Sequence, residues 1–126
     1  MTSRKLTNSM NTKAQTGQEG ESLAADYLES KGYSILEKNY RHKRSEIDLI
    51  VNLNNLLIFV EVKTKTNTSY GNPEIAIDQQ KAAKVMEGAD YYIQESDWKG
   101  NIRFDVISII KKKSDVEIEH FEDAFY

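Results

Sequence analysis

Apolar residues recur at helical spacing in TGQEGESLAADYLESKG, residues 16–32, where Leu23, Ala24, Tyr27 and Leu28 share one face. Thr16 precedes this stretch as a candidate N-cap. Gly32 follows it, at the position where a left-handed helix end favours glycine. The pattern therefore predicts an amphipathic helix over these residues.

A second helical pattern begins after Asp78, which is another candidate N-cap. Its apolar stripe predicts one buried face, made of Ala82, Val85, Met86, Ala89, Tyr92 and Ile93. The polar segment TNTSYGNP at 66–73 contains glycine and proline, and it predicts a loop before this helix.

Short apolar runs predict five strands. They are YSILEKNY at 33–40, the two halves of SEIDLIVNLNNLLIFVEVK at 45–63, RFDVISII at 103–110 and VEIEHF at 116–121. The resulting order of helix, three strands, helix and two strands is typical of an α/β domain. Residues 1–15 are polar and aperiodic, so we expect a flexible tail followed by one domain over residues 16–126.

Asn54 and Asn55 predict a tight turn in the hairpin, because asparagine tolerates the positive φ that such turns need. Counting outwards from the turn gives the register. One continuous apolar face would join Ile47, Leu49, Val51 and Leu53 to Val62, Val60, Ile58 and Leu56. On the other face, Asp48 would lie opposite Glu61, and Glu46 opposite Lys63.

Two acids facing each other across a hairpin destabilise it, since their Cβ atoms would be only about 5 Å apart. Protonation of one carboxyl, a nearby cation or a bound metal would relieve the repulsion between Asp48 and Glu61. Oxygen ligands alone favour Mg2+ over zinc. The ordinary interpretation is a solvated strand face with a Glu46–Lys63 pair, and geometry alone favours it.

Charge and composition narrow the function. The net charge of -3 and pI near 5.4 argue against a protein that coats nucleic acid through bulk positive charge. Residues 1–45 carry +3 and residues 86–126 carry -5, so a phosphate-binding surface is better placed in the first part, around RHKR at 41–44. The absence of cysteine excludes disulfides, thiolate nucleophiles and cysteine-bound zinc. No run is long enough to span a membrane and no secretory signal is evident, so we expect a cytoplasmic protein.

The spacing of an acid, a dozen residues and then Glu-x-Lys resembles the PD-(D/E)XK nuclease superfamily, through Asp48, Glu61 and Lys63. A longer pattern resembles the YraN-like uncharacterised protein family, which is similar to Holliday-junction resolvases. It covers roughly residues 17–110 and consists of GESLAADYLESKGYSILEKNYR, EIDLI, FVEVKTK, YGNPEIAID, Lys81 and RFDVI.

The resemblance implies a restriction-endonuclease-like core, in which helices flank a central mixed sheet. It also implies a catalytic site made of Glu21, Asp48, Glu61 and Lys63. Asp48 and Glu61 would bind Mg2+, or alternatively Mn2+, with the Val62 carbonyl and Glu21 as further ligands. Lys63 would orient the attacking water or stabilise the transition state. The chain departs from the family at Ser45, where glycine is usual, and at Lys65, where arginine is usual.

The leading expectation is a metal-dependent endonuclease that acts on branched or structured DNA. The residues expected to contact phosphates are Arg41, Lys43, Arg44, Lys65, Gln80 and Lys81, with Gln79 beside them. A homodimer is a further expectation, with no organic cofactor and no membrane partner. Two alternatives stay open: a catalytically silent module that binds nucleic acid or recruits a partner, and an interaction protein whose acids are merely solvated. His42 and His120 lack ligand spacing and are expected to be exposed or rim residues.

Overall fold

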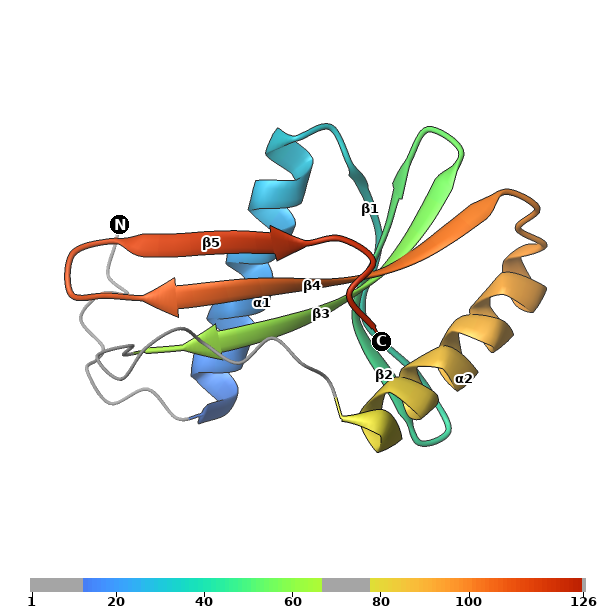
Figure 1. Cartoon of the computed structure of the whole chain (residues 1–126), viewed down its shortest axis with the longest axis horizontal. Coiled ribbons are helices and arrows are strands. Elements are labelled where there is room, and N and C mark those ends of the chain that lie inside the picture. Colours follow the sequence, from blue (N-terminus) through green and yellow to red (C-terminus); the bar gives the residue numbers. More distant parts are fainter. Residues whose placement is uncertain (1–12, 67–77, 126) are drawn as a thin grey trace.

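A computed structural model describes residues 13–66 and 78–125, which form two helices and five strands (Figure 1). The order is the predicted one, with bounds α1 Lys13–Ser30, β1 Ser34–His42, β2 Ser45–Leu53, β3 Leu56–Lys65, α2 Gln79–Ser96, β4 Asn101–Lys111 and β5 Val116–Phe121. The predicted tail at 1–15 lies outside the described residues except for the last three, which begin α1. The predicted loop at 66–73 lies outside them from residue 67 onwards.

The strands form one mixed sheet in the order β1-β2-β3-β4-β5, in which only the β3–β4 pair is parallel. The helices cover opposite faces of this sheet (Figure 1). The chain therefore has an α/β fold in which helices flank a central mixed sheet, consistent with the predicted restriction-endonuclease-like core. Among the described residues, neither helix is long and apolar enough to cross a membrane.

Each face of the sheet has its own hydrophobic core. Against α1 the buried residues are Ala24, Ala25, Leu28, Leu49, Val51, Ile58, Val60, Ile107 and Ile109. Against α2 they are Ile47, Ile50, Leu57, Phe59, Val85, Ala89, Val106 and Phe125. Strands β2, β3 and β4 contribute to both cores, which explains why their sequences are nearly continuous apolar runs. Met86, predicted in the buried stripe of α2, is 40% exposed and lies at its edge.

Two of the three helix ends predicted from the sequence are confirmed. Gly32 has a φ of 96°, and the Tyr33 and Gly32 N–H groups donate to the Leu28 and Glu29 carbonyls, as in a Schellman motif. Asp78 caps α2 by accepting a hydrogen bond from the Lys81 N–H at 2.8 Å. Only the predicted Thr16 cap is wrong. The helix begins at Lys13 because the lysine, alanine and glutamine before the threonine favour helix.

The hairpin register is confirmed from Leu53–Leu56 to Leu49–Val60, where the β2–β3 ladder ends. Beyond this point the strands separate, and Figure 1 shows β3 continuing beside β4 while β2 runs towards α2. The predicted pairs of Asp48 with Glu61, Ile47 with Val62 and Glu46 with Lys63 are therefore not ladder pairs.

The predicted continuous apolar face is also wrong at its end, since Ile47 packs in the α2 core and Leu49 in the α1 core. The neighbouring strand explains the change. Its pairing with β2 passes from Lys38–Leu49 to Tyr40–Ile47, and Asn39 between these pairs has a φ of 53°. A left-handed residue interrupts the pleat, so the two-residue alternation does not continue through Asp48.

Glycines bring both helices close to the separating strands. A Cβ on Gly20 of α1 would collide with the Thr64 side chain of β3. A Cβ on Gly88 of α2 would lie 2.8 Å from the Ser45 Cβ of β2. Ser45 is 2% exposed, and its hydroxyl donates to the Lys84 carbonyl at 2.6 Å. The serine that departs from the family pattern thus fastens α2 to β2.

We expect Gly88→Ala to lower the free energy of unfolding by about 1–2 kcal/mol, because the overlap with Ser45 outweighs the helix propensity of alanine. Gly17→Ala is the matched control in α1, where a Cβ would meet nothing within 4 Å. The control should raise stability by roughly 0.5–1 kcal/mol. Urea denaturation measures both, and equal effects would show that the close approach of α2 is not needed.

Candidate functional site

Asp48 and Glu61 lie together at the point where β2 and β3 separate. The Val62 N–H donates to Asp48 Oδ2 at 2.8 Å, so a carboxylate takes the place of the next ladder acceptor. This bond draws Asp48 towards β3, and its carboxyl group comes within hydrogen-bonding reach of Glu61. The sequence-based prediction that these two acids meet is therefore confirmed, although the contact does not arise from strand pairing.

The charge of Asp48 disfavours the charge of Glu61, whereas the hydrogen bond with Glu61 lowers the pKa of Asp48 against the effect of burial. Burial, and then the charge of Asp48, raises the pKa of Glu61 to about 7, although Lys81 opposes the rise. Burial also raises the pKa of Asp48 above its ordinary value, against the hydrogen bond from Val62. Because the groups interact, they titrate as a pair that retains part of one proton near neutral pH.

Glu21 brings a third carboxyl group from α1. Its side chain contacts those of Asn39 and Asp48, and burial followed by the charge of Asp48 raises its pKa. Gly20 beside it allows the helix to approach Thr64 closely, which holds the glutamate near the end of the ladder. The predicted acids therefore form a series in which Asp48 lies between Glu21 and Glu61.

Two carboxylates remain as the best-placed metal ligands. Within residues 13–66 and 78–125, no set of three histidine, cysteine, aspartate or glutamate side chains is arranged to hold a metal. However, Glu61 Oε1 is buried and has no hydrogen-bond partner among these residues. Mg2+ is often held by one or two carboxylates together with water and substrate oxygens, so Asp48 and Glu61 fit such an ion. The ligand role of the Val62 carbonyl stays a prediction.

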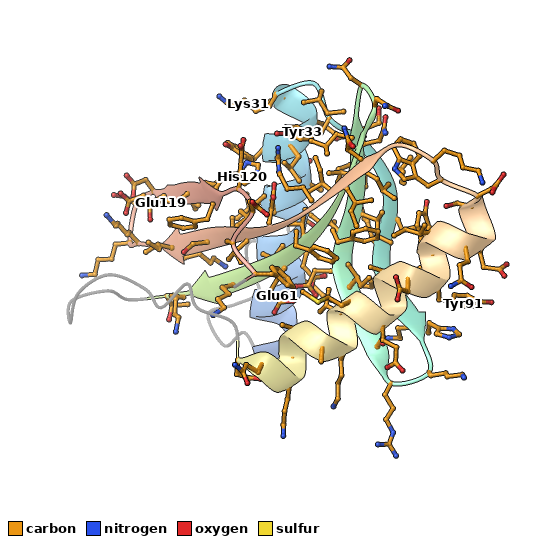
Figure 2. The ribbon with its side chains drawn as sticks, turned by 45° about the vertical axis from the view of Figure 1, so that its right-hand side comes forward. Lys31, Tyr33, Glu61, Tyr91, Glu119 and His120 are labelled. Atoms are coloured by element: carbon orange, nitrogen blue, oxygen red, sulfur yellow. The ribbon has the colours of Figure 1, made fainter. Side chains whose placement is uncertain are left out.

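Of the two lysines near the acids, Lys63 lies where it was predicted and Lys81 has an unexpected partner. Lys63 lies opposite Ser108 in the β3–β4 ladder, two residues beyond Glu61 on the same face, as predicted. Lys81, predicted to contact phosphate, instead places its Nζ 3.1 Å from Glu61 Oε2. Burial lowers the pKa of Lys81, but Glu61 and Asp48 outweigh this effect and raise it above the ordinary value. Figure 2 shows Glu61 close to the beginning of α2, from which Lys81 extends.

The other predicted phosphate contacts do not gather at one point. Arg41, Lys43 and Arg44 surround the β1–β2 turn, and Arg41 pairs with Glu46 at 3.4 Å. Gln79 and Gln80 are exposed in the first turn of α2, and Lys65 ends β3. In Figure 1 the β1–β2 turn and the end of β3 lie on opposite sides of the beginning of α2. These residues therefore flank the acids and do not form one patch.

Sequence analysis missed a second polar cluster, which is centred on Asp105 in β4. Asp105 accepts two bonds from Arg103 at 2.8 Å, one from the Asp123 N–H at 2.9 Å, and contacts His120 Nε2 at 2.7 Å. The His120 side chain is only 8% exposed and meets Tyr33 edge-on (Figure 2), so of the two predicted positions, exposed or rim, the exposed one is wrong. This cluster fastens the C-terminal segment to the sheet. Its only sequence signal was an acid inside the apolar run RFDVISII.

The fold and the carboxylates at the separating strands define an α/β protein with a partly buried acidic site between two helices. A family comparison matches residues 20–109 to the uncharacterised protein family UPF0102, the YraN-like family. The chain belongs to this family. The match confirms the resemblance inferred from the sequence motifs.

Individual relatives agree with this assignment over most of the chain. The UPF0102 protein of Christiangramia forsetii is 39% identical over 89% of this chain and 94% of its own length. The relative from Thermodesulfovibrio yellowstonii is 44% identical over 89% of this chain and 96% of its own length. The relative from Persephonella marina is 43% identical over 86% of this chain and 91% of its own length.

We expect Asp48→Asn to raise metal-free stability by about 1 kcal/mol above pH 7, because asparagine still accepts from Val62 but does not repel Glu61. The sign follows from the raised pKa of Asp48. The contribution of Asp48 to wild-type stability is fully present below its ordinary pKa of 3.8. It is lost as the pH rises through the raised pKa of Asp48 in the folded state. The advantage of the variant should therefore disappear in acid.

Urea denaturation in EDTA at several pH values measures this difference. Asp90→Asn, an exposed acid on α2, is the matched control and should change little at any pH. A variant that is less stable than wild type at alkaline pH would mean that Lys81 fully compensates both carboxylates.

Proposed function

We propose that this protein is a metal-dependent endonuclease that hydrolyses phosphodiester bonds in branched or structured DNA. The supporting observation is the pair of acids, Asp48 and Glu61, held together in a partly buried position, where Glu61 Oε1 has no hydrogen-bond partner among the described residues. A fold seldom retains such mutually repelling groups without a use for them, so the pair favours binding of a divalent cation.

Asp48 and Glu61 would hold Mg2+, or alternatively Mn2+, with the Val62 carbonyl as a further ligand. The bound ion would supply polarisation of the phosphoryl group and acidification of water. Lys63, on the same face as Glu61, would orient that water or stabilise the charge that develops on the phosphate. Glu21, which reaches Asp48 from α1, would fix the orientation of the Asp48 carboxylate.

DNA would contact the basic residues on both sides of the acids. Arg41, Lys43 and Arg44 would bind phosphates on one side and Lys65 on the other, with Gln80 between them. A protein with a net charge of -3 gains little affinity from its overall field, so binding would rely on these local groups. A homodimer in the cytoplasm would place two copies of these basic residues around a DNA junction.

A second candidate is a catalytically silent module that binds nucleic acid or recruits a partner. Two observations favour it: the described residues lack a three-residue metal group, and Lys81 already neutralises Glu61. The two functions differ in their need for metal, because phosphate contacts alone do not require Mg2+.

Cleavage assays distinguish these functions. Purified protein is incubated with four-way junctions, flaps, single strands and linear duplexes, in Mg2+, Mn2+ or EDTA. We expect metal-dependent cleavage of the branched substrates, reduced by roughly 100-fold or more in Glu61→Gln and in Lys63→Ala. Glu87→Gln and Lys99→Ala, two exposed residues away from the acids, are the matched controls and should cleave normally.

Two outcomes would contradict the nuclease proposal. Cleavage that persists unchanged in Glu61→Gln and Lys63→Ala would come from a contaminant. Junction binding that is equal in Mg2+ and EDTA, without cleavage in any condition, would establish the silent module instead.

A further inference from the structure

Lys81 is placed where a metal ion would otherwise neutralise the acids. Its ammonium group lies 3.1 Å from Glu61 Oε2, and the Glu61 side chain is only 11% exposed. The charge of Lys81 also acts on Asp48 and lowers its pKa, against the effect of burial. One lysine therefore compensates two carboxylates that would otherwise repel each other in a poorly solvated position.

A divalent cation on the same carboxylates would repel this ammonium group. Both cations would compete for Glu61 Oε2, and the low local polarity would strengthen their repulsion. Glu61 Oε1 is buried and without a partner in the described residues, so it is open to a cation that the lysine does not reach. Occupancy by metal and by Lys81 is therefore mutually unfavourable.

The surroundings of Lys81 allow the ammonium to leave without moving the helix. The backbone N–H of Lys81 donates to Asp78 Oδ1 at 2.8 Å, and this bond anchors the backbone of Lys81. Its side chain is 44% exposed, so the ammonium has a route to solvent. The first turn of α2 contains no acidic residue that would hold the released lysine. Glu46, whose charge already acts on Lys81, pairs with Arg41. DNA phosphates that approach the exposed Gln79 and Gln80 would therefore offer a new partner.

We propose that Lys81 is an exchangeable counter-ion, which occupies the carboxylate pair in the metal-free protein and transfers to a substrate phosphate when a divalent cation enters. This inference rests on the proposed function, because it assigns a metal and a phosphodiester to the same site. Through the transfer, metal binding frees a phosphate ligand, and phosphate binding removes a competitor of the metal. The two ligands should then bind with positive coupling.

The first test measures Mn2+ affinity by calorimetry on the full chain without DNA, at an alkaline pH where protons do not compete for Glu61. Lys81→Gln should bind Mn2+ roughly tenfold more tightly than wild type, because the competing cation is absent. Lys81→Arg keeps the charge and should resemble wild type. Lys84→Gln, which removes a charge one turn further along α2, should change affinity little. Asp48→Asn added to Lys81→Gln should abolish the binding.

The second test measures transfer to phosphate in the Lys63→Ala background, which should not cleave DNA. Mn2+ should raise the affinity for a four-way junction by about tenfold, and by much less when Lys81→Gln is added. Affinity for DNA without metal should be similar in both, since Lys81 is then held by Glu61.

The outcomes separate this proposal from the proposed function. If Lys81→Gln binds Mn2+ no more tightly than wild type while wild type cleaves DNA, the exchange is refuted and the nuclease stands. If Lys81→Gln binds Mn2+ more tightly and metal raises junction affinity only with Lys81 present, the exchange holds even when no cleavage occurs. If neither wild type nor Lys81→Gln binds Mn2+, both proposals are overturned.

Discussion

The hydrogen bond from the Val62 N–H to Asp48 Oδ2 is the contact on which the site depends. It lies just beyond Leu49–Val60, where the β2–β3 ladder ends. A backbone acceptor there would have continued the hairpin and left the acids in an ordinary solvated face. Here the acceptor is the Asp48 carboxylate, so a charged side chain joins the two strands. Its charge acts on the neighbouring Glu61 and raises the pKa of that carboxyl group. The end of the ladder and the close approach of the two acids therefore coincide at this one hydrogen bond.

The helices complete the site because glycine and serine set their distances from the sheet. Gly20 brings α1 against Thr64 and so presents Glu21 to Asp48. Gly88 and Ser45 bring α2 against β2, and the same helix presents Lys81 to Glu61. One helix adds an acid and the other adds a cation. These small residues, which carry no charge themselves, therefore determine that Glu21 meets Asp48 and that Lys81 meets Glu61.

Sequence patterns were sufficient wherever local periodicity determines structure. Apolar alternation and the Asn54-Asn55 turn gave the elements and the hairpin register as far as Leu49. They failed beyond it, since the left-handed Asn39 belongs to a neighbouring strand and leaves no trace in the pattern of β2. The partner of Lys81 was hidden for a similar reason. The Asp78 cap predicts where α2 begins, but only tertiary packing decides which carboxylate its third residue meets.

Three kinds of relief exist for two acids forced together: a proton, a fixed cation or a metal ion. The chain itself supplies the first two at once, because the pKa of Glu61 remains at about 7 even with the Lys81 Nζ 3.1 Å from its Oε2. A lysine strong enough to suppress the proton entirely would also hold the acids against any incoming ion. Incomplete compensation would leave the pair able to accept a further cation in the proposed function. Glu61 Oε1, which has no hydrogen-bond partner among the described residues, is the atom that such a cation would reach.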